Sequence, residues 1–125
     1  MRRFVFTVDL KDDPPAIAAY REYHQRVWPE VIDSLRRAGI MTMDIYLLER
    51  RAVMVLETDG RDPGRCFAMH RAAGPRVAEW EALMQSLQQP PPGGQPGEWW
   101  VQMEPVFSLE SEVDTSVASR RAGRA

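Results

Sequence analysis

Two neighbouring strand patterns in the middle of the chain constrain the fold most strongly. The charged tip Glu49-Arg50-Arg51 makes a short turn between a pattern at residues 40–48 and one at 52–57. A turn this short joins antiparallel neighbours, so the fold is built around an antiparallel strand pair. One face of the first strand carries Met41, Met43, Ile45 and Leu47, and the other carries Thr42, Asp44, Tyr46 and Leu48.

Strand and helix patterns on both sides of this pair complete the order β-α-β-β-α-β. That order predicts an α+β, ferredoxin-like fold, in which a four-stranded antiparallel sheet carries helices on one face. Before the central pair we predict a strand at 3–10, a helix from Asp12-Asp13-Pro14 to the Trp28-Pro29 break, and a helical segment at 29–37 that stops at Gly39. After the pair we predict helical pieces at about 65–73 and 75–87 and a strand at about 99–109.

The second face of this sheet needs cover. Helices on one face leave the other open, and alternation directs Tyr46 and Leu48 toward the open face. Two sheets that pair face to face would bury both side chains. We therefore expect a homodimer.

The chain has the length of a single domain, and its pattern changes at about residue 110. Residues 1–110 hold all the periodic segments, together with a long loop at 90–97 that is rich in proline and glycine. Residues 111–125 lack apolar periodicity and are predicted to be a disordered C-terminal tail. The long loop is of the kind that often covers a functional site.

Composition excludes several classes of protein. The net charge is −2, with both signs interspersed, so nothing indicates a nucleic-acid surface. No apolar run is long enough to cross a bilayer, and the N-terminus lacks the apolar core of a signal peptide. Cys66 is the single cysteine, which fits a cytoplasmic protein. It lies four residues before His70, but two ligands do not make a zinc site, so we interpret both residues as structural.

One stretch, residues 20–30, carries the chemistry. It holds His24, with Tyr20 one helical turn before it and the Trp28-Pro29 step one turn after it. Residues four apart share a helix face, so a phenol, an imidazole and an indole should line one surface, and Pro29 should leave Trp28 at a corner. Such a face suits proton exchange with a small polar ligand such as a sugar. A histidine among aromatic neighbours also fits a purely structural role.

Residues throughout the domain carry a resemblance to a known family. The matching segments are Tyr20-x-x-x-His24-x-x-x-Trp28-Pro29-Glu30, Ala38-Gly39-Ile40, Ile45-Tyr46, Val53-Met54, Glu57-Thr58, Glu79-Trp80-Glu81 and Met84. Over about residues 3–109 the chain resembles the L-rhamnose mutarotase family, which are small isomerases of sugar anomers. The tail lies outside the resemblance.

This resemblance implies a fold, an activity and a set of site residues. It implies a dimeric α+β barrel of ferredoxin-like chains that interconverts the α and β anomers of a deoxyhexose, a monosaccharide, with no cofactor and no metal. It also implies that His24 is the proton donor and that Tyr20 contacts the sugar. It further implies contacts with the sugar from Met43, Trp80 and Glu81. Independently of the resemblance, the indole rings of Trp28 and Trp80 are suited to cover the apolar face of a sugar.

Two positions distinguish branches of the family. The rhamnose-acting branch usually has a tyrosine where this chain has Met43 and a second tryptophan where it has Glu81. The runs at residues 10–14, 79–84 and 88–90 look more like the L-fucose mutarotase branch, although Trp99 stands where that branch often has a basic residue. We therefore expect L-fucose as the sugar, with L-rhamnose as the alternative.

Alternatives remain for individual residues and for the function. Trp80 also fits the core, Met43 a gap in the core, and Glu81 a solvated helix surface. Dimeric ferredoxin-like monooxygenases and haem-handling proteins share the predicted fold, and a haem or flavin absorption band would indicate them. A non-catalytic sugar-binding domain would bind the sugar without changing the rate of anomer exchange.

Overall fold

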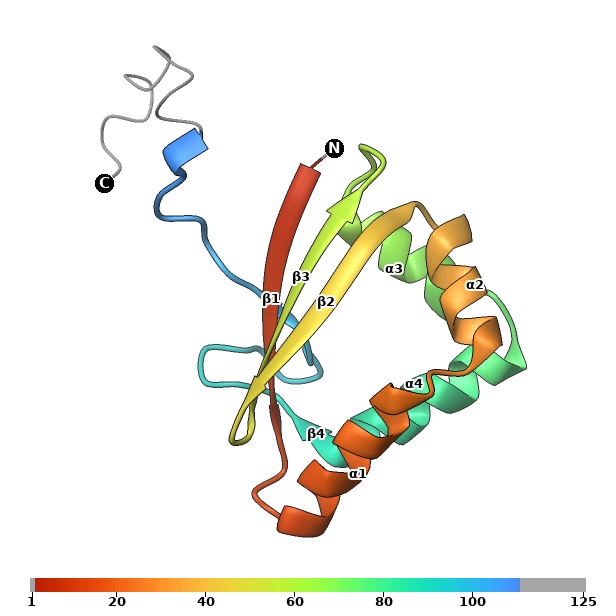
Figure 1. Cartoon of the computed structure of the whole chain (residues 1–125), viewed down its shortest axis with the longest axis vertical. Helices are drawn as coiled ribbons and strands as arrows, with labels where there is room; N and C mark the ends of the chain where they lie inside the picture. Colours follow the sequence, from red (N-terminus) through yellow and green to blue (C-terminus); the bar gives the residue numbers. More distant parts are fainter. Residues whose placement is uncertain (1, 111–125) are drawn as a thin grey trace.

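The computed structural model describes residues 2–110, and the tail predicted at 111–125 lies outside them. Helices cover one face of an antiparallel sheet and leave the other face open (Figure 1). The sheet contains β1 (Arg2–Leu10), β2 (Ile40–Leu48) and β3 (Arg51–Thr58). With the short β4 (Gln88–Gln89), its order is β2-β3-β1-β4, and the ferredoxin-like α+β fold is confirmed. Within the described residues no helix is long and apolar enough to cross a membrane.

The last strand differs from the prediction. Instead of one strand at about 99–109, two short pieces, β4 (Gln88–Gln89) and β5 (Val101–Gln102), pair with different parts of β1. The backbone N–H of Met103 makes one more hydrogen bond, to Val5 O at 2.7 Å, and beyond it the chain leaves the sheet (Figure 1). Pro105 lacks the N–H that a longer ladder would require, which explains the early end of the pairing.

The helical layer consists of four helices. They are α1 (Pro14–Gln25), α2 (Pro29–Arg37), α3 (Pro63–Arg71) and α4 (Pro75–Leu87). Each helix has a proline in its first turn, where the missing N–H has no partner to lose. Trp28 is extended, with ψ 136°, at the corner between α1 and α2, as Pro29 predicted.

Two buried clusters fill the space between the sheet and the helices. One cluster contains Phe6, Ala38, Ile40, Met54, Leu56 and Cys66, and the other contains Leu10, Tyr20, Val31, Trp80 and Met84. Met41 was predicted to face inward, but it is exposed, because the β2–β3 register shifts between Ile40 and Thr42. The extra residue of such a bulge reverses the alternation at that point.

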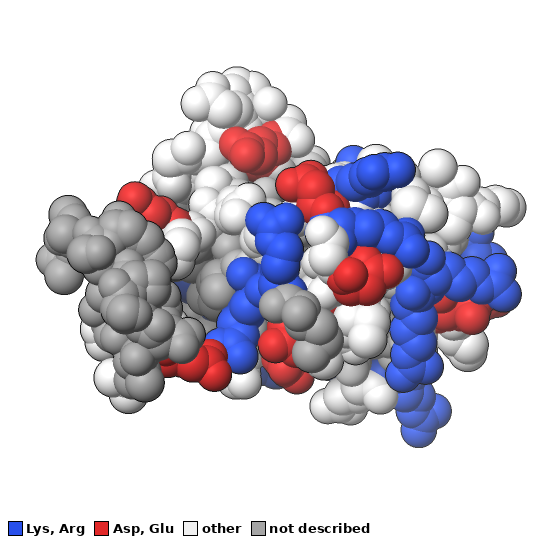
Figure 2. All heavy atoms as spheres, turned by 90° about the horizontal axis from the view of Figure 1, so that it is seen from above, with Lys and Arg blue, Asp and Glu red and all other residues white. Residues whose placement is uncertain are grey.

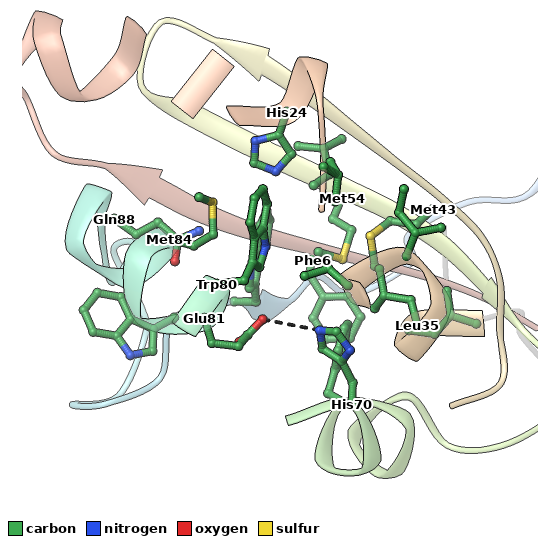
Figure 3. Close-up of a pocket in the computed structure, with 18 of the residues that line it drawn as sticks. Phe6, His24, Leu35, Met43, Met54, His70, Trp80, Glu81, Met84 and Gln88 are labelled. Carbon is green, nitrogen blue, oxygen red and sulfur yellow. Dashed lines mark ion pairs between the residues drawn. The ribbon is translucent and has the colours of Figure 1, made fainter. Parts of the chain in front are cut away.

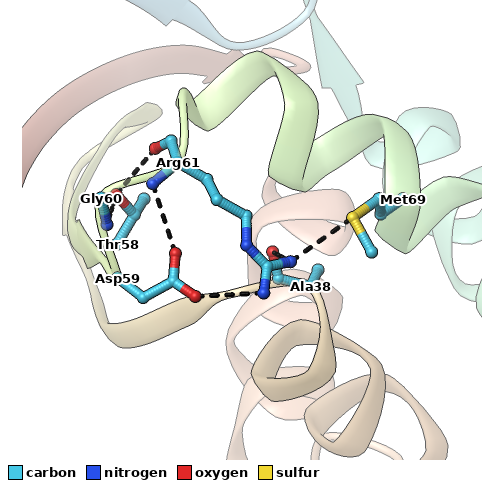
Figure 4. Close-up of polar contacts among 6 residues, drawn as sticks. All are labelled: Ala38, Thr58, Asp59, Gly60, Arg61 and Met69. Carbon is cyan, nitrogen blue, oxygen red and sulfur yellow. Dashed lines mark hydrogen bonds and ion pairs between the residues drawn. The ribbon is translucent and has the colours of Figure 1, made fainter.

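The loop after β3 joins the ends of α2 and α3 (Figure 4). Arg61 donates a hydrogen bond from Nη1 to the carbonyl oxygen of Ala38 at 3.2 Å and pairs with Asp59 at 3.2 Å. Gly39 has φ +101°, and an added Cβ would lie 2.9 Å from an Asp59 carboxylate oxygen, so only glycine fits. These contacts hold the C-terminal end of α2 beside α3.

The open face of the sheet is apolar in part. Tyr46 is 63% exposed and Leu48 is 74% exposed, so their predicted orientation is confirmed. Elsewhere the surface mixes charges, and basic side chains lie beside acidic ones on the face that Figure 2 shows.

Candidate active site

A cavity of about 1050 Å³ lies between the sheet and the helices. Side chains from all four helices and from the three long strands line it, together with residues 97–100 at the end of the long loop. Its polar wall residues include His24, His70, Glu81 and Gln88 (Figure 3). Tyr20 also lines it. The volume is ample for a monosaccharide, and apolar walls with a few polar groups are typical of small-molecule sites.

His24 is held in one tautomer by its own helix. Its Nδ1 lies 2.8 Å from the carbonyl oxygen of Tyr20. Because a carbonyl can only accept, Nδ1 carries the hydrogen, and in the neutral ring Nε2 has a free lone pair. Burial lowers the pKa of His24 below its ordinary value, and the backbone hydrogen bond opposes this only in part. No side chain within residues 2–110 makes a hydrogen bond to Nε2, and a neutral imidazole with this lone pair available can act as a general base.

Tyr20 stands beside the imidazole as a neutral phenol. Its ring centroid lies 4.3 Å from that of His24, and the side chain is only 3% exposed. Burial raises the pKa of Tyr20 to about 12; a side-chain hydrogen bond with Gln88 lowers it, and the charge of Glu81 raises it further. The hydroxyl therefore keeps its proton throughout the physiological range and can donate it in a hydrogen bond.

Trp80 forms the aromatic centre of the site. Its ring packs edge-on against His24, with centroids 5.7 Å apart, and against Trp28, with centroids 5.1 Å apart. In Figure 3 it lies between His24 and the pair formed by Glu81 and His70. The tryptophan thus separates the His24 imidazole on α1 from Glu81, the acidic side chain that follows it on α4.

Trp28 is the predicted site residue that does not line the cavity. The expectation that Tyr20, His24 and Trp28 share one helix face is wrong, because α1 ends at Gln25 and Trp28 lies in the extended corner beyond it. Its ring packs on Trp80, and the Arg76 guanidinium lies 3.7 Å from the ring centroid. Trp28 therefore supports Trp80 from behind.

Met43 and Glu81 both line the cavity. Met43 comes from β2 and lies on the side of the cavity away from Trp80, next to Leu35 (Figure 3). Glu81 comes from α4, and its Oε2 lies 3.6 Å from Nε2 of His70. The structure thus brings five of the six predicted site residues to one cavity.

His70 is a cavity residue that sequence reasoning missed. It lies on α3, is 3% exposed, and its Nδ1 is 2.8 Å from Oγ of Ser34 on α2. No spacing signal could have found this contact, because the two residues are 36 positions apart. Cys66 is buried in the core, and among the described residues no cluster of three His, Cys, Asp or Glu side chains could hold a metal ion.

Comparisons with known proteins identify the family of this chain. A family model described as L-rhamnose mutarotase matches residues 3–109. The chain is 39% identical to an L-fucose mutarotase of Xanthomonas campestris, over 95% of this chain and 97% of the relative. It is 28% identical to an L-rhamnose mutarotase of Jannaschia, over 87% of this chain and 99% of the relative.

Solved structures give the same fold. The L-rhamnose mutarotase from Formosa agariphila superposes with a TM-score of 0.64 at 22% identity, covering 87% of this chain and 99% of the other. The family model spans nearly the whole described part, and the Xanthomonas relative matches along almost its full length. This chain is therefore a member of the L-rhamnose mutarotase family.

Proposed function

We propose that this chain is a cofactor-independent mutarotase that interconverts the α and β anomers of a 6-deoxyhexose, with L-fucose as its preferred sugar. One observation carries the proposal. His24 has its Nδ1 hydrogen bonded to a backbone carbonyl and lines a monosaccharide-sized cavity beside the neutral phenol of Tyr20. Proton acceptor and hydrogen-bond donor are the two groups that anomer exchange requires.

The reaction needs only proton transfers. Nε2 of His24 removes the proton from the anomeric hydroxyl. The bond between the anomeric carbon and the ring oxygen then breaks, the anomeric oxygen becomes the aldehyde carbonyl, and the His24 imidazolium donates the same proton to the ring oxygen. The product is the open-chain aldehyde, whose carbonyl turns its other face to the same hydroxyl. Reclosure reverses the proton transfer: neutral His24 accepts the proton of that hydroxyl as the ring bond forms, and the imidazolium donates it to the new anomeric oxygen. Tyr20 hydrogen bonds to the ring oxygen and stabilises the charge that develops there. Atoms and charges balance without an oxidant or a metal.

The remaining cavity residues bind the sugar. Trp80 packs on its apolar face, and the Glu81 carboxylate accepts hydrogen bonds from its hydroxyls. Met43 contacts the sugar from the opposite wall. Trp28 acts through Trp80, since the two rings pack together.

The preference for L-fucose rests on two positions and one relative. Met43 and Glu81 stand in the cavity wall, where the rhamnose-acting branch is expected to have aromatic residues. A carboxylate in place of an indole makes this wall less flat and more acidic. The 39% identity to a relative named L-fucose mutarotase supports the same choice.

Saturation transfer between anomer signals in NMR tests both parts of the proposal. We expect faster exchange of L-fucose than of L-rhamnose, and we expect Met43→Tyr with Glu81→Trp to narrow or reverse that preference. The uncatalysed exchange measured without protein is the control. Absence of exchange above this background contradicts the activity, and equal rates on both sugars contradict the preference.

The assembly and location belong to the same proposal. We expect a homodimer, because exposed Tyr46 and Leu48 leave an apolar region on the uncovered sheet face. A monomer in light scattering at micromolar concentration would contradict it, and Leu48→Lys should weaken the dimer. A cytoplasmic location stays a prediction, which the single free cysteine supports.

A further inference from the structure

A buried polar pair, of which His70 lines the cavity, has no part in the proposed proton transfers. Ser34 on α2 and His70 on α3 are 7% and 3% exposed, and their side chains are joined by a 2.8 Å contact between Oγ and Nδ1. Burying a hydroxyl and an imidazole costs free energy unless both are paired, so two polar groups at this place need an explanation.

The second ring nitrogen of His70 faces Glu81. Nε2 of His70 lies 3.6 Å from Oε2 of Glu81, and among the described residues His70 is the one ion-pair partner of this carboxylate. The Glu81 side chain is 33% exposed, so part of it still faces the open cavity. On this side the cavity is therefore lined by His70 and Glu81 (Figure 3), and Ser34 contacts His70 through its other ring nitrogen.

The chemistry of the three groups fixes the direction of the series. An ionised carboxylate only accepts hydrogen bonds, so an unprotonated Nε2 would place two lone pairs against each other. The favourable neutral tautomer has the hydrogen on Nε2, and Ser34 then donates its hydroxyl hydrogen to Nδ1. If the imidazole is protonated, Nε2 still presents a hydrogen to Glu81. In both states His70 attracts the carboxylate.

The separation of His70 and Glu81 suits a ligand contact. A distance of 3.6 Å is longer than a hydrogen bond, so the carboxylate is attracted without being saturated. It can turn toward a hydroxyl in the cavity and remain close to Nε2. A free glutamate on a helix surface would lose more side-chain entropy on binding than one already held in place.

We propose that Ser34 and His70 are positioning residues, which hold the Glu81 carboxylate at the cavity wall so that it accepts hydrogen bonds from the hydroxyls of the sugar. This inference rests on the proposed function and deepens it, because it concerns recognition of the sugar at the same site. It assigns no proton-transfer step to His70. The effect of the pair passes through Glu81 and appears in binding.

The test is a double-mutant cycle on sugar binding. The variants are His70→Leu and Ser34→Ala, each made in the natural protein and in the Glu81→Gln background. For each we would measure KM and kcat for L-fucose exchange, the Kd of L-fucose by calorimetry, and the melting curve. Without His70 the Glu81 carboxylate is no longer held at the wall, and its hydrogen bonds to the sugar weaken. KM and Kd should then rise about tenfold in His70→Leu and about threefold in Ser34→Ala, with kcat within about threefold. In the Glu81→Gln background both increases should fall below about twofold.

Two further variants separate positioning from general damage. His70→Gln keeps an amide donor near the place of Nε2, so it should recover part of the lost affinity. Ser86→Ala removes an exposed hydroxyl from α4 and is the matched control, with no expected change. If His70→Leu does not fold, Ser34→Ala and His70→Gln carry the cycle.

The outcomes distinguish the inference from the activity. Unchanged KM and Kd in the folded His70 and Ser34 variants overturn the inference, and so do increases that persist in full in the Glu81→Gln background. If the natural protein does not exchange anomers, the proposed function fails, and Kd still decides whether the pair positions Glu81.

Discussion

The two histidines stand on different walls of one cavity and are held in different ways. His24 is fixed by a carbonyl four residues earlier in its own helix, whereas His70 is fixed by a serine from a different helix. Among the described residues, Nε2 of His24 has no hydrogen-bond partner, whereas both ring nitrogens of His70 have protein partners. The comparison shows that a residue type does not define a role, because the partners of each nitrogen decide it.

The neighbours of the two rings differ in the same sense. Tyr20 and Trp80 surround His24, so burial lowers its pKa and favours the neutral base. Polar groups flank His70, which suits a structural and orienting part. Four predictions would break or sharpen this contrast.

The largest expected effect is on catalysis at His24. His24→Ala should lower anomer exchange by about 10²–10⁴, the usual contribution of a general acid–base group. The fold should persist, because the Tyr20 carbonyl that loses Nδ1 belongs to a helix and keeps its backbone partner. Exchange rates and melting curves would be measured on the same samples, with Glu22→Ala on the exposed side of α1 as the control. Full exchange in folded His24→Ala would remove the distinction between the two histidines.

The pH dependence should report His24. Its lowered pKa means that the neutral base is present above that value and is lost as the pH falls through it. We expect kcat/KM to fall about tenfold per pH unit on the acid side, with a midpoint below the ordinary pKa of about 6.5. Exchange rates between pH 4 and 8, corrected for the uncatalysed reaction, would show it. A midpoint above 6.5 would show that the fall of kcat/KM on the acid side reports a group other than His24.

The free energy of unfolding should depend more on His70 than on His24, the reverse of the order expected for catalysis. His70→Leu leaves the buried Ser34 hydroxyl without a partner, which should cost about 1–3 kcal/mol, while His24→Ala should cost less. Thermal or urea unfolding of both variants measures the difference. A larger loss of stability in His24→Ala than in His70→Leu would reverse our interpretation of which histidine holds the fold together.

The smallest effect is expected at Tyr20. Tyr20→Phe keeps the buried ring and removes only the hydroxyl, so it tests hydrogen bonding without a change in packing. Exchange should fall by the equivalent of one hydrogen bond, about 0.5–1.5 kcal/mol, or more if that bond strengthens in the transition state. A loss as large as that of His24→Ala would make Tyr20 a proton-transfer group in its own right.

Much of the fold follows from local patterns, and its errors have physical causes. Pro29 and Gly39 set the bounds of α2, because the fixed φ of a proline ring and the positive φ of a glycine determine the backbone only within a few residues. The last strand was predicted too long, since strand pairing depends on which N–H groups meet β1. The prediction that Tyr20, His24 and Trp28 share a helix face was wrong for Trp28, because α1 ends at Gln25, before Trp28 and Pro29.

The sequence by itself determined the fold class, the family and the pairing of Tyr20 with His24, because a spacing of four residues on a helix already brings two side chains together. Tertiary structure alone decided which wall each residue would occupy. It placed Trp28 behind Trp80, and it brought His70 between Ser34 and Glu81. The physical reason is that α2, α3 and α4 meet only when their apolar faces are buried together, and no local spacing encodes the contacts that this packing creates.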